Sequence, residues 1–245
     1  MTKNVTATIV AMALAACLSG TASAASPNLI QNGSFENLTN GTGQLGYNTD
    51  AVGWTTNGYN FAFNSGTADT SGTSGSYGYL GLWGPGNGSN NGLTDSSPDG
   101  GNFIANDGAF GVAPLQQTIT GLTAGNKYAV SFYWGAAQQS GYNGDTTDMW
   151  TVSLGNQSFA TPIETIPSHG FSGWHLQTFE YTATSNTEVL SFLAKGTPEG
   201  VPPFALLDGV SMKPVPEAGT VVSMFIGILM MGAFVRRRAV AKKLS

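Results

Sequence analysis

Cysteine is almost missing from this chain of 245 residues, and its single copy, Cys17, lies near the amino terminus. Cleavage of a leader after Ala24 would leave no cysteine, which excludes disulfides and thiol catalysis from the mature protein. Only 9% of the residues are charged, and there are two histidines. The sequence has no His-Glu-x-x-His zinc motif, no Gly-x-Ser-x-Gly elbow and no phosphate-binding Gly-Lys-Ser/Thr loop. We therefore expect a protein that is not an enzyme.

Positive charge is also scarce. The formal net charge is −5, but six of the nine basic residues lie at the two ends of the chain: Lys3, Arg236, Arg237, Arg238, Lys242 and Lys243. Without these six residues, the chain has three lysines against 14 acidic residues, a difference of −11. An anionic surface repels phosphate backbones and anionic lipids, so nucleic acid is excluded as a partner.

The amino terminus has the pattern of an export signal. Lys3 precedes an apolar run from Val5 to Leu18, and Ala22-Ser23-Ala24 has the small-x-small form that signal peptidase cleaves. We expect residues 1–24 to be a signal peptide. An alternative overlaps it, because Leu14-Ala15-Ala16-Cys17 fits the lipobox pattern, in which Cys17 becomes a lipidated first residue.

The carboxyl terminus has three parts in a fixed order. Val215-Pro216-Glu217 precedes an uncharged apolar run from Val221 to Val235, and a basic cluster follows: Arg236, Arg237 and Arg238. The run is 15 residues long, about 23 Å as a helix, and predicts a short transmembrane helix whose arginines stay in the cytoplasm. A plain membrane anchor is one interpretation.

This tail, residues 214–245, resembles the PEP-CTERM sorting signal of Gram-negative bacteria, although Ala218 stands where that family usually has a second proline. The resemblance implies an exosortase-type processing enzyme at the inner membrane as a partner. It also implies transient anchoring, removal of the tail, and release or attachment at the cell surface.

Alternating apolar residues dominate the body between these ends, residues 25–213. Tyr128, Val130, Phe132 and Trp134 share one face of a strand, as do Phe179, Tyr181 and Ala183 in a second strand. No long stretch of the body has a helical period. The segments Asn64–Ser76 and Gly84–Gly101, rich in Gly, Ser and Asn, are expected to be loops. The sequence predicts an all-β fold.

The body resembles the galactose-binding-like jelly rolls of many carbohydrate-binding modules. The resemblance is carried by Asn28–Glu36, Gly53-Trp54, Leu115–Tyr128 and Leu206–Met212. It implies a single jelly-roll β-sandwich in which the first and last segments run together. It also implies one structural Ca²⁺, with oxygen ligands from Glu36, Asp208 and nearby backbone carbonyls. The family's second Asp is replaced here by Gly209.

Aromatic side chains beside the polar loops are the candidate ligand contacts, because sugars stack on flat rings and bond neighbouring amides. The candidates are Trp83, Tyr77 and Tyr79, with a polar rim from Gln138, Gln139, Tyr142 and Asn143. Core packing is expected for Trp54, Trp134, Trp150 and Trp174. The loop carboxylates, among them Asp107 and Asp148, are expected to be solvated or to cap turns.

Together these features predict an exported, non-catalytic protein of the cell surface or extracellular matrix that binds extracellular polysaccharide. One alternative is a structural or self-assembling matrix protein without a sugar site. A second is a polysaccharide hydrolase, if Glu164, Glu180 and Asp148 converge in space.

Overall fold

The computed structural model describes residues 27–216. Several predicted features lie outside the described residues: the signal peptide with Cys17, and the tail residues Glu217, Val221–Val235 and Arg236, Arg237 and Arg238. Between residues 27 and 216, no helix is long and apolar enough to cross a membrane.

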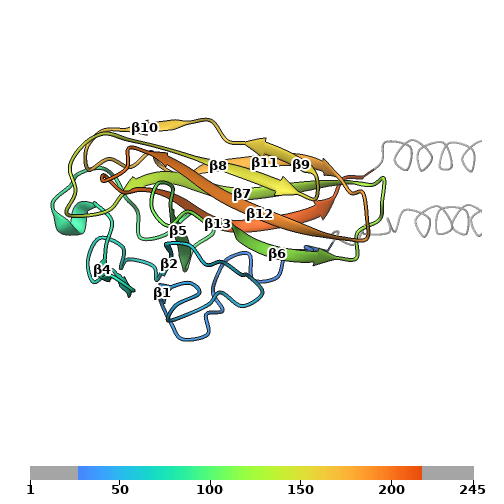
Figure 1. Ribbon diagram of the computed structural model, residues 1–245, viewed down its shortest axis with the longest axis horizontal. Coiled ribbons are helices and arrows are strands. Elements are labelled where there is room, and N and C mark those ends of the chain that lie inside the picture. The colour runs from blue at the N-terminus through green and yellow to red at the C-terminus, as the bar shows by residue number, and fades with distance from the viewer. Residues whose placement is uncertain (1–26, 217–245) are drawn as a thin grey trace, which may run out of the picture.

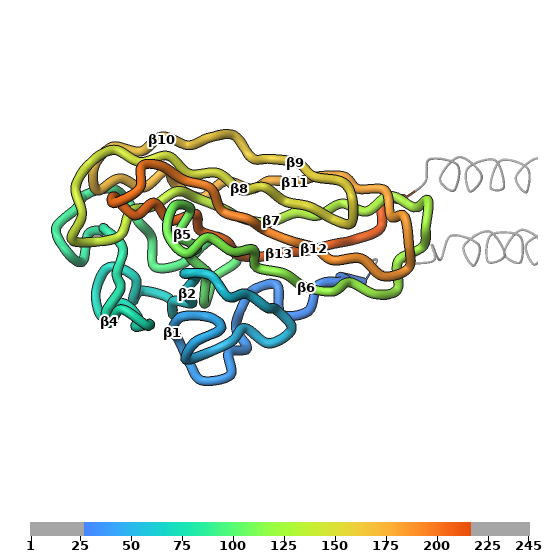
Figure 2. The backbone as a smooth tube through the Cα atoms, in the orientation of Figure 1, coloured from blue at the N-terminus to red at the C-terminus, as the bar shows by residue number. Residues whose placement is uncertain are grey.

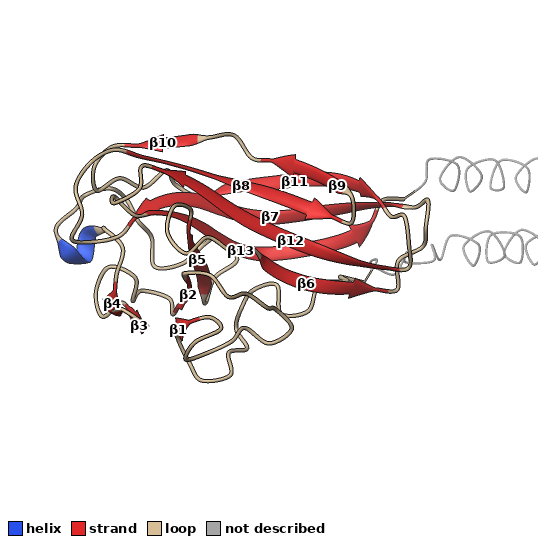
Figure 3. Cartoon of the chain, in the orientation of Figure 1, coloured by secondary structure: helices blue, strands red, loops and turns tan. Residues whose placement is uncertain are grey.

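Almost all regular structure in the described chain is β-strand, as predicted, with a single helical turn (Figure 3). The elements in chain order are β1 (Gly43–Gln44), β2 (Asn60–Phe63), β3 (Thr73–Gly75), β4 (Gly78–Leu80), η1 (Pro85–Asn87), β5 (Phe103–Asp107), β6 (Leu115–Thr120), β7 (Lys127–Gln138), β8 (Thr146–Leu154), β9 (Gln157–Ala160), β10 (Glu164–Ile166), β11 (His175–Thr182), β12 (Thr187–Thr197) and β13 (Pro203–Pro214).

Two antiparallel sheets face each other and form a sandwich (Figure 1). One has the order β1-β2-β5-β13-β7-β11, and the other has the order β10-β8-β12-β6, with β9 paired to β8. Numbering the eight main strands from β5, and leaving out β9, gives orders 1-8-3-6 and 5-4-7-2. This is the strand order of a jelly roll, in which the last strand lies beside the first, so the topology confirms the predicted architecture.

The six-stranded sheet is buried on both faces along β2, β5 and the first half of β13. One face packs against the second sheet through residues such as Ile104, Phe132 and Leu207, together with Trp150 and Phe192 from the opposite sheet. The other face carries a second apolar cluster around Phe61, Phe103, Phe204 and Leu206. β5 therefore reads Phe-Ile-Ala-Asn-Asp, with every residue buried, instead of alternating.

The second cluster exists because the chain before β5 lies along the outer face of this sheet. Figure 2 shows this part of the chain, coloured blue to cyan, as loops and short strands beside the long strands. It includes the β3–β4 hairpin, which corrects the expectation that Asn64–Ser76 is loop throughout. The first described residues run along β13, where Leu29 N–H donates to Met212 O at 2.9 Å. The predicted meeting of the first and last segments is thus confirmed, although Asn28–Ile30 forms no strand.

The turn between β6 and β7 forms a corner of the sandwich. Leu122 is buried in the core, and the Tyr128 hydroxyl accepts a hydrogen bond from Thr123 N–H at 2.9 Å. Tyr128 thereby fixes the turn that aligns β7, whose far end reaches the candidate site.

Candidate functional site

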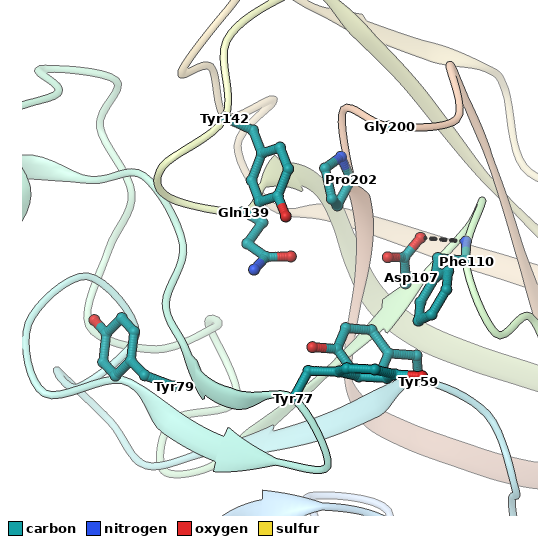
Figure 4. A pocket seen from close by; sticks show the side chains of 9 residues that line it. All are labelled: Tyr59, Tyr77, Tyr79, Asp107, Phe110, Gln139, Tyr142, Gly200 and Pro202. Atoms are coloured by element: carbon teal, nitrogen blue, oxygen red, sulfur yellow. Dashed lines mark hydrogen bonds between the residues drawn. The ribbon is translucent and has the colours of Figure 1, made fainter.

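A cavity of about 440 Å³ opens where the β3–β4 hairpin faces the end of β5 (Figure 4). Its lining is rich in tyrosine and has one carboxylate and one side-chain amide. The lining residues are Tyr59, Tyr77, Tyr79, Asp107, Phe110, Gln139, Tyr142, Gly200 and Pro202. Four of the seven predicted ligand contacts, Tyr77, Tyr79, Gln139 and Tyr142, are among them.

The β3–β4 hairpin supplies one wall. Tyr77 lies in its two-residue turn and is 72% exposed, and Tyr79 on β4 is 57% exposed. The Tyr79 hydroxyl donates to Thr70 O at 3.2 Å, so this ring is tied to the loop before β3. Large rings left this accessible on a folded β domain are a feature of binding surfaces.

Three rings form the floor by packing edge to face. Tyr59, just before β2, contacts Tyr77 with ring centroids 5.8 Å apart and Phe110 at 5.3 Å, and Tyr77 contacts Phe110 at 5.6 Å. This geometry is the favoured one for aromatic pairs. Burial raises the pKa of the Tyr59 hydroxyl, and the nearby Asp107, Tyr142 and Tyr77 raise it further.

Asp107, the last residue of β5, carries the single carboxylate of the lining. Its Oδ1 accepts the N–H groups of Ala109 and Phe110 at 2.8 and 2.9 Å, which caps the turn after the strand. Its Oδ2 is buried and has no hydrogen-bond partner within the described residues. Burial raises the pKa of Asp107 to about 6, against the lowering effect of the two N–H groups. Asp107 caps a turn, as one reading expected, but it is not solvated.

Gln138 is placed differently from the prediction. Its side chain has no exposed surface, accepting His169 N–H at 2.6 Å and donating to Gly144 O at 2.8 Å. Side chains alternate along a strand, so its neighbour Gln139 points the other way and lines the cavity. Gln138 holds the loops behind the cavity, and Gln139 contributes the side-chain amide of its lining.

Trp83 does not line the cavity but supports it. Its ring stacks on His169 with centroids 3.9 Å apart, and its Nε1–H donates to the carbonyl of Tyr142 at 2.9 Å. His169 Nε2 in turn lies 2.8 Å from Oδ1 of Asn143. Trp83 therefore positions the loop that carries Tyr142.

The residues of the predicted calcium site meet at another corner of the sandwich. The exposed Glu36 accepts the N–H of Asn102 through Oε1 at 2.7 Å. Asp208 is fully buried, and Ser97 Oγ donates to its Oδ2 at 2.5 Å. Burial raises the pKa of Asp208 to about 8, with a further upward effect of Asp99 and Glu36. Within residues 27–216, no three acidic, histidine or cysteine side chains are grouped to hold a metal ion.

The three carboxylates considered for hydrolysis do not converge. Asp148 and Glu164 are cross-strand partners on β8 and β10, but Asp148 has no exposed surface. Glu180 lies on β11 of the other sheet, opposite Ala129. Asp148 was expected to be solvated. It is instead inside the sandwich, where burial raises the pKa of its carboxyl well above the usual range, with a smaller contribution from Asp107.

Of the predicted sorting motif, Val215 and Pro216 lie within the described residues. Val215 N–H donates to Lys127 O at 2.9 Å, so backbone pairing with β7 continues one residue past β13. These two residues line a separate cavity of about 370 Å³ with Lys127 and Glu180, at the opposite end of β7 from Gln139.

Comparison with known proteins gives a limited likeness. No protein-family profile matches the chain. Halomucin of Haloquadratum walsbyi is 31% identical over 211 residues, which cover 83% of this chain. The chain spans only 2% of the length of halomucin.

Several solved domains have a backbone path similar to that of this chain. The match to TmCBM61 in complex with β-1,4-galactotriose covers 78% of this chain and 100% of the TmCBM61 chain, at 14% sequence identity and with a TM-score of 0.41. The CBM22-1 xylan-binding domain of Paenibacillus barcinonensis Xyn10C matches 79% and 98% at 13% identity, with a TM-score of 0.39. The K1 adhesin domain of Lys-gingipain from Porphyromonas gingivalis matches 75% and 96% at 14% identity, also with a TM-score of 0.39. These TM-scores lie under 0.5, so the architecture rests on the strand pairing itself.

Proposed function

We propose that this chain is an exported, non-catalytic protein that binds extracellular polysaccharide in the tyrosine cavity. The observation that carries the proposal is the cavity itself, in which exposed tyrosine rings surround a few convergent polar groups. Ligand pockets generally combine apolar and aromatic walls with a small number of placed polar groups. Sugars match this combination, because their C–H faces stack on rings while their hydroxyls bond amides and carboxylates.

The lining assigns complementary roles. Tyr77, Tyr79 and Tyr142 offer accessible ring surface, and Phe110 extends it toward Asp107. Gln139 can donate and accept hydrogen bonds. When Asp107 is ionised, its Oδ2 acts only as an acceptor. At about 440 Å³, the cavity is within the usual range for small-molecule sites and suits one or two sugar residues of a longer chain.

The sequence of the tail supports the proposed export to the cell surface. A processing enzyme of the exosortase type would act near Val215-Pro216-Glu217 after export, with the apolar segment as a transient inner-membrane anchor. Val215, the first residue of the motif, still pairs with Lys127 of β7, so the motif begins at the end of the sandwich. The intact mass of the native protein would establish both processed ends.

A calcium ion at the corner of Glu36 and Asp208 remains part of the proposal. Burial raises the pKa of Asp208, and the neighbouring carboxylates of Asp99 and Glu36 raise it further; a hard cation would relieve the repulsion among the three groups. Since these side chains are not grouped closely enough to hold an ion alone, backbone carbonyls would have to complete its ligand set.

The test of sugar binding is a glycan array probed with the full-length protein and with the Tyr77→Ala variant. We expect signal on a subset of polysaccharides for the unchanged protein and its loss for the variant. A blank array for the folded protein would instead favour the structural matrix role. Release of shorter sugars from a bound polysaccharide would favour the hydrolase.

A further inference from the structure

The free oxygen of Asp107 distinguishes this cavity from a neutral sugar site. Asp107 is 1% exposed, and while Oδ1 is held by two backbone N–H groups, Oδ2 is buried without a donor among the described residues. In Figure 4 the carboxyl group lies among the lining side chains, with one oxygen bonded to Phe110 N and the other free. A buried acceptor left without a partner costs free energy, so a ligand that supplies a donor there is favoured.

The rings around this carboxylate favour a donor that is positively charged. Tyr59, Tyr77 and Phe110 pack against one another beside Asp107, and Tyr142 approaches from the opposite wall. The faces of aromatic rings attract cations, and the attraction increases where water is excluded. An ionised carboxylate enclosed by aromatic rings is a typical arrangement for binding an amine.

The other charged and titratable groups near Asp107 supply no competing cation. The hydroxyls of Tyr59, Tyr77 and Tyr142 come from the cavity walls, and the buried Asp148 lies behind it on β8. Glu199 lines an adjoining cavity of about 290 Å³ with Phe110 and Pro202. No lysine, arginine or histidine of the described chain is among the residues that line the tyrosine cavity.

None of the three lysines of residues 27–216 lines the tyrosine cavity. Lys127 begins β7 and Lys213 lies at the end of β13, at the opposite end of the sandwich. Lys195 on β12 is exposed and forms no ion pair with Asp107. With no cation in the lining, an ionised Asp107 makes the field at the cavity negative.

We propose that the tyrosine cavity binds an amino sugar, with the sugar's ammonium group on Asp107 Oδ2 and its ring face on the tyrosines. The proposal rests on the proposed function and specifies its ligand: a polysaccharide that contains sugar residues with free, protonated amines. An N-acetyl group would replace the cation with a bulkier neutral amide and lose the charge-assisted bond, which is about twice as strong as a neutral one.

The test compares three oligosaccharides of equal length by isothermal titration at pH 7: the glucosamine hexamer, its fully N-acetylated form and cellohexaose. We expect the glucosamine hexamer to bind at least about tenfold more tightly than the others, the usual advantage of a hydrogen bond to a charged group. The preference should weaken on acidification through the pKa of Asp107, about 6, and should disappear in Asp107→Asn.

Asp107→Asn is a conservative probe because the amide oxygen can still accept the N–H groups of Ala109 and Phe110. Thermal unfolding of the variant confirms that it is folded. Glu180→Gln is the control. It removes one exposed charge from β11 beside Ala129, at the end of β7 far from the cavity, and should leave the preference intact. An equal loss in both variants would mean general attraction to an anionic protein and would overturn the proposal.

Two failures are distinguishable. If cellohexaose or the N-acetylated hexamer binds as tightly as the amino form, the ligand assignment is wrong while sugar binding stands. If none of the three binds and the glycan array is also blank, both the assignment and the proposed function are wrong.

Discussion

Gln44 holds Ser76 at two points: its Oε1 accepts the Ser76 N–H at 2.8 Å and the Ser76 hydroxyl at 2.9 Å. Ser76 is the first residue of the turn that also contains Tyr77, so one side chain from β1 positions the hairpin wall of the cavity. A two-stranded hairpin is marginally stable alone, and this one depends on such ties to the body.

Replacing Gln44 with alanine should loosen the hairpin and weaken sugar binding. The two lost hydrogen bonds to Ser76 should cost about 1–3 kcal/mol in total, since each is worth about 0.5–1.5 kcal/mol. Hydrogen exchange at residues 73–80 should speed up. Gln157→Ala is the matched control, because Gln157 bonds both backbone groups of Thr182 away from the cavity. Equal binding in the two variants would argue against a positioned hairpin.

Tyr77 and Trp83 should respond differently to truncation. Tyr77 is 72% exposed, so Tyr77→Ala should change the free energy of unfolding by less than about 1 kcal/mol while abolishing binding. Trp83→Ala removes the stack on His169 and the bond to Tyr142 O, and should cost about 2–4 kcal/mol with a secondary loss of affinity. Chemical denaturation and titration of both variants measure this contrast. A stable Trp83→Ala that has lost all binding would instead make Trp83 a direct contact.

Stability should fall as the pH rises. Burial raises the folded-state pKa of Asp107 to about 6, of Asp208 to about 8, and of Asp148 well above its usual value. Each group holds its proton in the folded chain but releases it near pH 4 when unfolded. Its stabilising contribution is thus complete below pH 4 and is lost as the pH passes the folded pKa, a window from about pH 4 to 8.

The midpoint of thermal unfolding in EDTA should therefore be lower at pH 8 than at pH 5. Asp148→Asn should reduce this difference, because the amide has no proton to lose. Glu180→Gln, an exposed change of the same kind, should not reduce it. A midpoint that rises with pH in this range would show that these carboxyls are not buried as described.

Calcium should raise the unfolding midpoint if the corner of Glu36 and Asp208 holds an ion. Stabilisation follows from binding to the folded state alone and grows with the free ion concentration. Glu36→Gln tests the site without disturbing the core, since Glu36 is exposed, and should abolish the shift. Identical midpoints in EDTA and in millimolar calcium would remove the metal from the account.

Much of the sandwich could be predicted because its long strands alternate. β7 and β12 lie in different sheets, and each faces the opposite sheet with every other residue, a pattern that is visible in the sequence. β5 and the first half of β13 are buried on both faces, so their lack of alternation hid the second apolar cluster. That cluster arises from long-range packing of the chain before β5, which periodicity cannot indicate.

The site was predicted in part for a similar reason. The exposed rings of Tyr77, Tyr79 and Tyr142 could be proposed from their place beside polar loops. Which of Gln138 and Gln139 faces the cavity depends on the alternation of side chains along β7, and the sequence did not show it. Tyr59 and Asp107 were not assigned to the site, since nothing in a Gly-rich segment says which carboxylate is enclosed. The one available signal was that Asp107 directly ends an apolar strand.

The most direct test of the account is titration of the full-length protein with the polysaccharide that gives the strongest array signal, with Tyr77→Ala and Glu180→Gln alongside. Measurable affinity in the unchanged protein and in Glu180→Gln, with none in Tyr77→Ala, is the predicted result. Undiminished affinity in a folded Tyr77→Ala would place the ligand somewhere other than the tyrosine cavity and contradict the central claim.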